Sequence, residues 1–247
     1  MTEVLFETDE AALEELLASL KAERVLDVAT GRADFLAWLL ESLGETGVGI
    51  AVDDQRRAVE AVRSRFPDNS IVPVQMDAVR LAFPTGLFDL VAISQSLHHL
   101  PSPQSSLEEM QRVLRPGGVL LMREMYADGQ TEAQLTHVAL HHWWAAIDTA
   151  RGISHRITYS REELAGMFLE LAHEHVRCFD FAEPEGDPFD AETVEQLEEI
   201  IDRYQGFAEP LPQAEVFQRQ GEELREQLQR VGFQGAAQLV MLGWTSA

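Results

Sequence analysis

Five short apolar runs alternate with helix-like stretches in the first half of the chain, and this rhythm restricts the fold more than any other feature. The runs are Arg24 to Val28, Val48 to Val52, Ile71 to Gln75, Phe88 to Ser94 and Val119 to Arg123. Such continuous apolar runs are typical of parallel strands that are buried on both faces. Their alternation with helices predicts a doubly wound α/β sheet.

The second half of the chain is mainly helical, with two further strand-like runs at His175 to Phe181 and Gln238 to Trp244. Apolar residues at helical spacing predict an N-terminal helix at about 8–22. Later helices are expected at Thr131 to Thr149, Ser160 to Ala172, Ala191 to Tyr204 and Gln213 to Val231. We predict a single domain over 1–247, with a core at about 23–124 and helical insertions at about 129–150 and 188–231 that cover one end of the sheet.

Capping-box spacing marks three expected helix starts: Ser106 with Glu109, Thr131 with Gln134, and Ser160 with Glu163. The run from Arg115 to Gly118 should end a helix before Val119, because proline resists helical continuation and glycine accepts positive φ.

Charge and composition favour a small-molecule partner. The formal net charge of -23 would repel a nucleic-acid backbone and an anionic membrane surface. The acidic first residues lack the pattern of a signal peptide, and no apolar run has the length of a membrane span. Cys178 is the single cysteine, so an internal disulfide is excluded and a cytoplasmic location is expected. The acidic surface is compatible with a high-salt habitat and equally with ordinary solubility; oligomeric state is left open.

Acidic residues follow three successive strands of the predicted sheet. Asp27 ends the first strand before a loop that contains Gly31, Asp53 ends the second, and Asp77 follows the third. Glycine lets the backbone approach a ligand, and a carboxylate can hold an ammonium group or accept hydrogen bonds from ribose hydroxyls or an adenine amino group. Asp54 could share or replace the role of Asp53. Ligands bind at the carboxyl ends of strands in open α/β sheets, so these residues predict a cofactor site.

Blocks from about Glu23 to Glu124 resemble the class I S-adenosylmethionine-dependent methyltransferases, in particular the type 11 group and the ubiquinone/menaquinone C-methyltransferases. They are VLDVATG, GIAVDD, QMDAVRLAF, FDLVAISQSLHHL and RVLRPGG, in that order. The resemblance implies a Rossmann-like sheet of seven strands, mostly parallel, with an antiparallel last strand. It also implies the cofactor S-adenosyl-L-methionine, the product S-adenosyl-L-homocysteine, and methyl transfer to a small-molecule acceptor by in-line displacement, with O-, N- and C-methylation all open.

The resemblance also assigns roles to residues of the core. It implies that Asp27 and the loop with Ala29 and Gly31 hold the methionine end, and that Asp53, with Asp54 beside it, holds the ribose. Met76, Asp77 and Ala78 would contact the adenine, and Ser94 and Gln95 would line the floor near the sulfonium. The family loop usually carries three glycines, whereas this chain has Ala29, Gly31 and Ala33. The Ala33 methyl group is expected to push the backbone slightly away from the ligand, and Arg32 adds bulk.

Histidines are the first candidates on the acceptor side. His98 and His99 follow the fourth strand, where a neutral imidazole could remove a proton, although a structural or binding role is favoured for both. Glu124 and Tyr126 follow the fifth strand and are further acceptor-side candidates.

The predicted helix with HVALHHWWAAID is the most individual segment of the chain. His141, His142, Trp143 and Trp144 could form a lid over the acceptor, or the helix could simply pack through its tryptophans. His137 and His141 have the spacing of helical metal ligands, but no third ligand is evident and no metal is expected.

Two other functions compete with methyl transfer. An NAD(P)-dependent oxidoreductase would share the fold, but its G-x-G-x-x-G fingerprint is absent. The chain could instead bind S-adenosylmethionine or a metabolite without catalysis.

Overall fold

The computed structural model describes residues 6–171, 173–183 and 186–246, which form two compact units. The sheet unit comprises Met1–Glu124, Glu162–Phe181 and Leu239–Ala247. The helical unit comprises Met125–Arg161 and Ala182–Gln238, and it contains both expected helical insertions. That the insertions cover one end of the sheet, and that the chain is a single domain, stay predictions.

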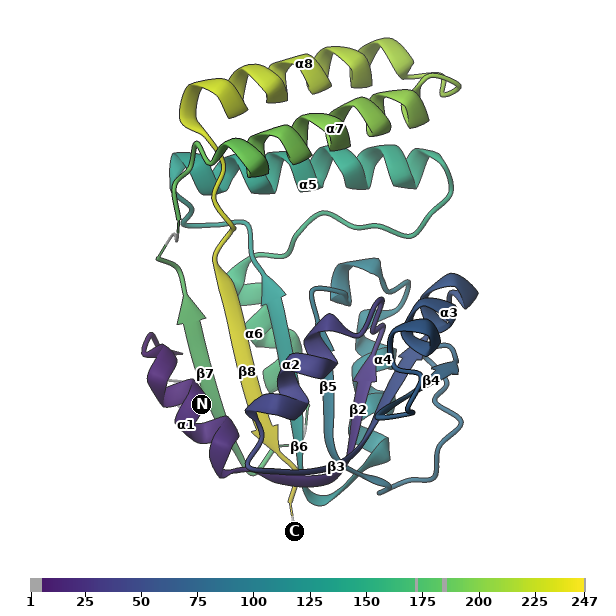
Figure 1. Ribbon diagram of the computed structural model, residues 1–247. Helices are drawn as coiled ribbons and strands as arrows, with labels where there is room; N and C mark the ends of the chain where they lie inside the picture. The colour runs from purple at the N-terminus through teal and green to yellow at the C-terminus, as the bar shows by residue number, and fades with distance from the viewer. Residues whose placement is uncertain (1–5, 172, 184–185, 247) are drawn as a thin grey trace. The chain divides into compact units, whose positions relative to one another are not determined.

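The sheet unit is built on eight strands in the order β1-β7-β8-β6-β5-β2-β3-β4 (Figure 1). The strands are β1 (Phe6–Glu7), β2 (Lys21–Val28), β3 (Glu45–Asp53), β4 (Ile71–Gln75), β5 (Phe88–Ser94), β6 (Leu114–Met125), β7 (His175–Phe181) and β8 (Gln238–Trp244). Strands β2 to β6 pair in parallel, and β8 runs opposite to its neighbours in Figure 1. The predicted α/β fold with an antiparallel last strand is confirmed, with the two-residue β1 as an additional edge strand.

The strand order has its switch point at β2, which pairs with β3 on one side and with β5 on the other. Asp27 lies opposite Ala51 of β3 and Ala92 of β5. A doubly wound sheet opens a crevice at such a switch point, beyond the carboxyl ends of its strands. Asp27 and Asp53, two of the predicted cofactor residues, end β2 and β3 beside this switch point, and their role in cofactor binding stays a prediction.

Helices cover the sheet on both faces. They are α1 (Glu10–Ser19), α2 (Asp34–Ser42), α3 (Arg56–Arg65), the short η1 (Leu97–His99), α4 (Pro103–Val113) and α6 (Arg161–Leu169). Leu17 of α1, Leu36 of α2 and Val62 of α3 belong to one apolar cluster with the strands. Figure 1 shows α4 and α6 behind the sheet, on the side away from α2.

Helix α4 begins earlier than expected. Its N-cap is Ser102 and Pro103 occupies the first turn, whereas Ser106 is buried inside the helix and donates to the Ser102 carbonyl at 3.0 Å. The predicted start at Ser106 is therefore wrong. Proline is favoured at the first helical position because its missing N–H is not needed there, and this signal outweighs the spacing of Ser106 and Glu109.

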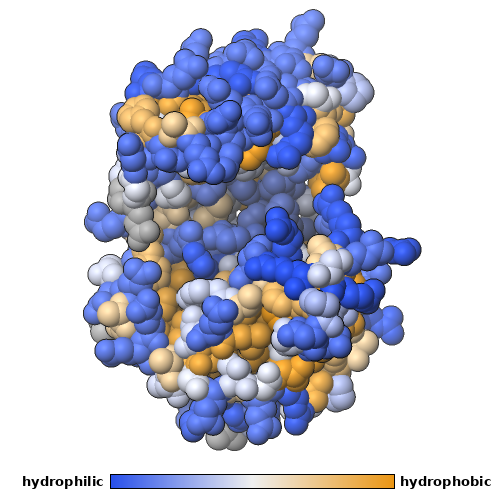
Figure 2. Space-filling model, viewed as in Figure 1, coloured by the Kyte–Doolittle hydropathy of each residue, from blue (hydrophilic) through white to orange (hydrophobic). Residues whose placement is uncertain are grey.

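The helical unit packs α5 (Glu132–Ala150), α7 (Ala191–Ala208) and α8 (Ala214–Val231) around one apolar core. Leu140, Ile201 and Leu228 supply one fully buried side chain from each helix. The predicted capping box of α5 is confirmed, because Thr131 Oγ1 accepts from the Gln134 N–H at 3.3 Å and Gln134 Oε1 accepts from the Thr131 N–H at 3.0 Å. On the side shown in Figure 2, hydrophilic residues dominate the surface of these helices. Among the described residues, no helix is both long and apolar enough to cross a bilayer.

Candidate functional site

The loop after β2 has left-handed backbone at three alternate positions. The φ angle is 56° at Ala29, 56° at Gly31 and 60° at Ala33. A Cβ atom added to Gly31 would meet nothing within 4 Å, so this side of the loop is open. The Ala33 methyl group is buried in the apolar cluster that includes α2. An open, tightly wound loop lets backbone N–H groups approach a ligand.

Asp27 is buried at the end of β2, with 2% of its surface exposed. Its Oδ2 accepts a hydrogen bond from Thr30 Oγ1 at 2.6 Å. Burial, with a smaller contribution from the charge of Asp53, raises the pKa of Asp27 to about 7 against the lowering effect of the Thr30 hydrogen bond. A carboxyl group with such a pKa is suited to a binding site for a cationic group, because the cation would stabilise the ionised carboxylate.

Asp53 organises the glycine loop. Its Oδ2 accepts from the Gly31 N–H at 3.0 Å, and its Oδ1 accepts from the Gln55 N–H at 2.9 Å. The neighbouring Asp54 is exposed, and its pKa is raised by partial burial and by the charges of Asp53 and Asp77. Asp53 therefore links the ends of β2 and β3, and Asp54 presents the more accessible carboxylate.

The predicted adenine residues follow β4. The Met76 N–H donates to the Asp53 carbonyl at 3.0 Å, which brings this segment to the end of β3. Asp77 Oδ1 accepts from the Val79 N–H at 3.0 Å, and Ala78 is buried. Asp77 thus shapes the turn that follows Met76, whose backbone lies beside Asp53.

Ser94 and Gln95 lie at the end of β5, next to the loop after β2. Ser96 Oγ donates to the Ala29 carbonyl at 3.1 Å and to the Ser94 carbonyl at 2.9 Å. Gln95 has a left-handed φ of 48°, and its N–H donates to the Arg123 carbonyl at 2.9 Å. Ser96, which lies in the block FDLVAISQSLHHL but received no role from the sequence, therefore joins the two loops across the switch point.

His98 and Glu124 form a buried pair. His98 Nδ1 lies 3.1 Å from Glu124 Oε1, and Glu124 Oε2 accepts from the Leu97 N–H at 2.9 Å. His99 is exposed, with its ring centroid 4.3 Å from that of His98. Glu124 does not follow the strand as expected but lies inside β6, which continues to Met125; from there it orients His98 and fixes η1.

Candidates in the helical unit are mostly engaged in packing. Trp143 Nε1 donates to the Phe217 carbonyl at 3.1 Å, and the Trp144 ring stacks on Tyr204 with centroids 5.7 Å apart. Tyr126 is buried and bridges Tyr159. These contacts fit packing, one of the three interpretations weighed for this helix, and the acceptor lid stays a prediction.

The histidines of α5 point to different partners. His142 Nε2 lies 2.5 Å from Thr158 Oγ1, and burial lowers its pKa. His141 Nε2 lies 3.1 Å from Nε2 of His155, whose Nδ1 lies 2.9 Å from Asp148 Oδ2. His155 and Asp148 received no role from the sequence, although Asp148 ends the segment HVALHHWWAAID, because the chain turns back after α5 to bring them together.

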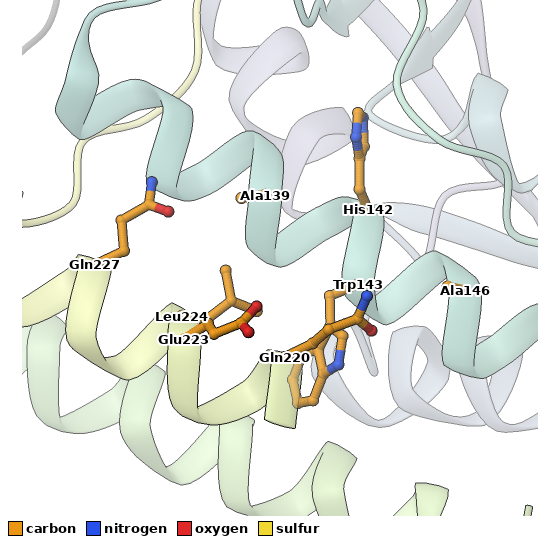
Figure 3. Close-up of a pocket in the computed structure, with 8 residues that line it drawn as sticks. All are labelled: Ala139, His142, Trp143, Ala146, Gln220, Glu223, Leu224 and Gln227. Carbon is orange, nitrogen blue, oxygen red and sulfur yellow. The ribbon is translucent and has the colours of Figure 1, made fainter. Parts of the chain in front are cut away.

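A cavity of about 340 Å³ opens between α5 and α8 within the helical unit. Figure 3 shows the Gln220, Glu223 and Gln227 side chains projecting from α8, with Trp143 on the facing helix and His142 directed away from α8. The remaining lining residues are Ala139, Ala146 and Leu224. The wall of this cavity on α8 is mainly polar, and the wall on α5 is mainly apolar.

A tightly wound loop at the end of β2, with carboxylates at the ends of adjacent parallel strands, forms the candidate cofactor site of the sheet unit. Residues 26–122 match the family model described as a methyltransferase domain. The matched segment lies entirely in the sheet unit.

Curated relatives of this chain include C-methyltransferases. The ubiquinone/menaquinone biosynthesis C-methyltransferase UbiE of Nitrosospira multiformis is 40% identical over 104 residues, which cover 41% of this chain and 43% of the relative. The protein of the same name from Yersinia pestis is 36% identical over 108 residues, or 42% of this chain and 43% of the relative. The chain thus spans less than half of the length of these relatives.

Solved structures match over nearly the whole chain. A putative methyltransferase from Bacillus halodurans has a TM-score of 0.60 at 19% identity, covering 96% of this chain and 99% of that one. A putative sarcosine dimethylglycine methyltransferase from Galdieria sulphuraria has a TM-score of 0.55 at 16% identity, covering 96% and 83%. These structures confirm the fold expected from the sequence.

Proposed function

We propose that this chain binds S-adenosyl-L-methionine in the crevice beyond β2, β3 and β5 and transfers its methyl group to a small-molecule acceptor. The observation that carries the proposal is the left-handed loop at Ala29, Gly31 and Ala33, held to β3 by the bond from the Gly31 N–H to Asp53. The bound cofactor would supply an electrophilic methyl group on a sulfonium.

The residues present fit such a ligand. Asp27 is a buried carboxylate with raised pKa, suited to a cationic ammonium group. Asp54 is the accessible carboxylate for ribose hydroxyls, with Asp53 holding the loop that shapes the site. Met76 and Ala78 would contact the adenine, and Ser94 and Gln95 would lie near the sulfonium. The chain's remaining task is to align the acceptor and exclude water, because methyl displacement needs a base only when the acceptor must lose a proton.

The acceptor is proposed only as a small molecule, because the helical unit lies outside residues 26–122, the segment that matches the methyltransferase domain model. The net charge of -23 supports a small acceptor over nucleic acid. Cys178 as the single cysteine supports a cytoplasmic location.

Calorimetry with S-adenosylmethionine and S-adenosylhomocysteine tests the proposal. Both should bind, and Asp53→Ala should weaken binding by about 1–3 kcal/mol because it frees the Gly31 N–H from its acceptor. Asp54→Ala tests the ribose contact, and Glu41→Ala, an exposed carboxylate on α2, is the matched control.

The outcomes separate the candidate functions. Absence of binding by the unmodified protein at millimolar ligand would refute the cofactor site. Binding without S-adenosylhomocysteine formation across a panel of phenols, amines, thiols and carbon acids would support a non-catalytic binding protein. If Asp54→Ala changes the cofactor affinity no more than the control Glu41→Ala does, the ribose contact would be assigned to Asp53 instead.

A further inference from the structure

Three polar side chains form a hydrogen-bonded chain within the helical unit. His141 and Asp148 are seven residues apart on α5, so they lie two turns apart on one face, and His155 follows in the loop after the helix. His155 Nδ1 lies 2.9 Å from Asp148 Oδ2, and His155 Nε2 lies 3.1 Å from His141 Nε2. All three residues are buried.

The loop that carries His155 is held in place by its own hydrogen bonds. The Ile153 N–H donates to the Asp148 carbonyl at 2.9 Å, and the Gly152 N–H donates to the Thr149 carbonyl at 3.0 Å. Thr149 Oγ1 donates to the His155 carbonyl at 2.9 Å. The fold therefore fixes the position of the His155 backbone before any ligand binds.

Asp148 is also fixed. Arg151 Nη1 donates to its Oδ1 at 3.0 Å, and the Tyr204 hydroxyl donates to its Oδ2 at 3.3 Å. Burial and the charge of Asp148 raise the pKa of Tyr204 to about 12, so the hydroxyl remains a donor. With Asp148 accepting from His155 Nδ1–H, the neutral His155 ring carries its lone pair on Nε2, toward His141.

The two Nε2 atoms have the separation of two ligands of one metal ion. Metal–nitrogen distances of 2.0–2.1 Å and a tetrahedral angle place two ligand nitrogens about 3.3 Å apart. We propose that His141 and His155 bind a divalent transition-metal ion through Nε2, with Asp148 as the carboxylate that orients His155. Metal-binding histidines commonly donate their second ring N–H to a carboxylate in this manner.

Imidazole ligands favour Zn²⁺, Fe²⁺, Ni²⁺ or Cu²⁺ over Mg²⁺ or Ca²⁺, which prefer oxygen. The pair His137 and His141, which helical spacing indicated, is not the one the structure brings together. His137 Nδ1 instead accepts from the Ala236 N–H at 2.9 Å. With His141 and His155 bound, a tetrahedral ion keeps positions for water, further side chains or a ligand atom.

The test uses the full chain, first stripped with a chelator and then titrated with Co²⁺ or Zn²⁺. The expected result is one equivalent of bound metal, with the visible absorption of four-coordinate Co²⁺. His141→Ala and His155→Ala should each abolish that absorption, and Asp148→Asn should weaken binding about 10- to 100-fold. His175→Ala, an exposed histidine on β7, should leave it unchanged. Single replacement of the remaining histidines identifies any further ligand.

Histidine ¹⁵N resonances of the unmodified protein give a second readout that does not depend on variant folding. Zn²⁺ should shift two Nε2 signals, assigned to His141 and His155, at one equivalent. Absence of stoichiometric binding, or binding that survives both alanine variants, would overturn the proposal, as would a persistent N–H···N signal between the two rings at saturating Zn²⁺. Neither assay requires cofactor or turnover. Failure of the metal-site proposal can therefore be distinguished from failure of the proposed methyl transfer.

Discussion

Protonation of Asp27 should control cofactor affinity. Its pKa of about 7 means that the free protein holds this carboxyl half-protonated near neutral pH. A cationic ammonium group favours the ionised form, so ligand binding should release a proton. If the protein binds the ligand only when Asp27 is ionised, its affinity for S-adenosylhomocysteine should fall about tenfold from pH 8 to pH 6 and should continue to fall below pH 6.

Ionisation of Asp27, which should favour cofactor binding, lowers the stability of the free protein. A carboxyl group whose pKa is raised by folding contributes stability that is fully present below its unfolded value of 3.8 and is lost as pH rises through about 7. A shift of this size corresponds to about 4 kcal/mol at most. Asp27→Asn should therefore stabilise the free protein near pH 8 while it weakens cofactor binding and removes most of the pH dependence.

Two measurements check this reasoning. Calorimetry at several pH values, in buffers of different ionisation enthalpy, gives affinity and proton release together. Urea unfolding of the unmodified protein and of Asp27→Asn at pH 5 and pH 8 gives the stability difference. Affinity that is constant over this range, or an Asn variant that is equally destabilised at both pH values, would refute the proposed ionisation of Asp27.

Further predictions concern backbone strain and a partly buried histidine. Ala29→Gly should raise the unfolding free energy by up to about 1 kcal/mol, because glycine adopts a φ of 56° without the steric cost of a Cβ atom; an Ala58→Gly change on α3 should destabilise instead, as urea midpoints will show. Burial lowers the pKa of His137 to about 4, so its contribution to stability is present above 6.5 and is lost as pH falls through 4. The unmodified protein should lose about 3 kcal/mol more than His137→Gln over this range, and equal losses in urea unfolding would contradict the assignment.

Strands were the most predictable elements because burial on both faces leaves an unbroken apolar run. The sequence ranges for β4, β5, β7 and β8 coincide with the observed strands. Strand β2 begins at Lys21, three residues before the predicted start, because polar residues at its exposed end interrupt the apolar run. Strand β1 has two residues, too few for any periodic signal.

The site was less predictable because a side chain's direction depends on its neighbours in space. The position of Asp53 was evident, but sequence could not show that both its oxygens face backbone N–H groups of Gly31 and Gln55. Likewise, Glu124 meets His98 only after β5 and β6 align in register. His155 lies in a loop without a motif, and its partners on α5 become neighbours only through the reversal of the chain.

The position of β8 has a consequence for synthesis. Although it is the last strand in the chain, it lies between β6 and β7 in the sheet. As the chain leaves the ribosome, β7 and β1 can pair with each other, but they have no hydrogen-bonded link to the β6 side until residues up to Trp244 have emerged. Until then the nascent protein exposes two open strand edges, which are sites where incomplete chains can associate with one another. Completion of the sheet is thus a late event that one strand controls.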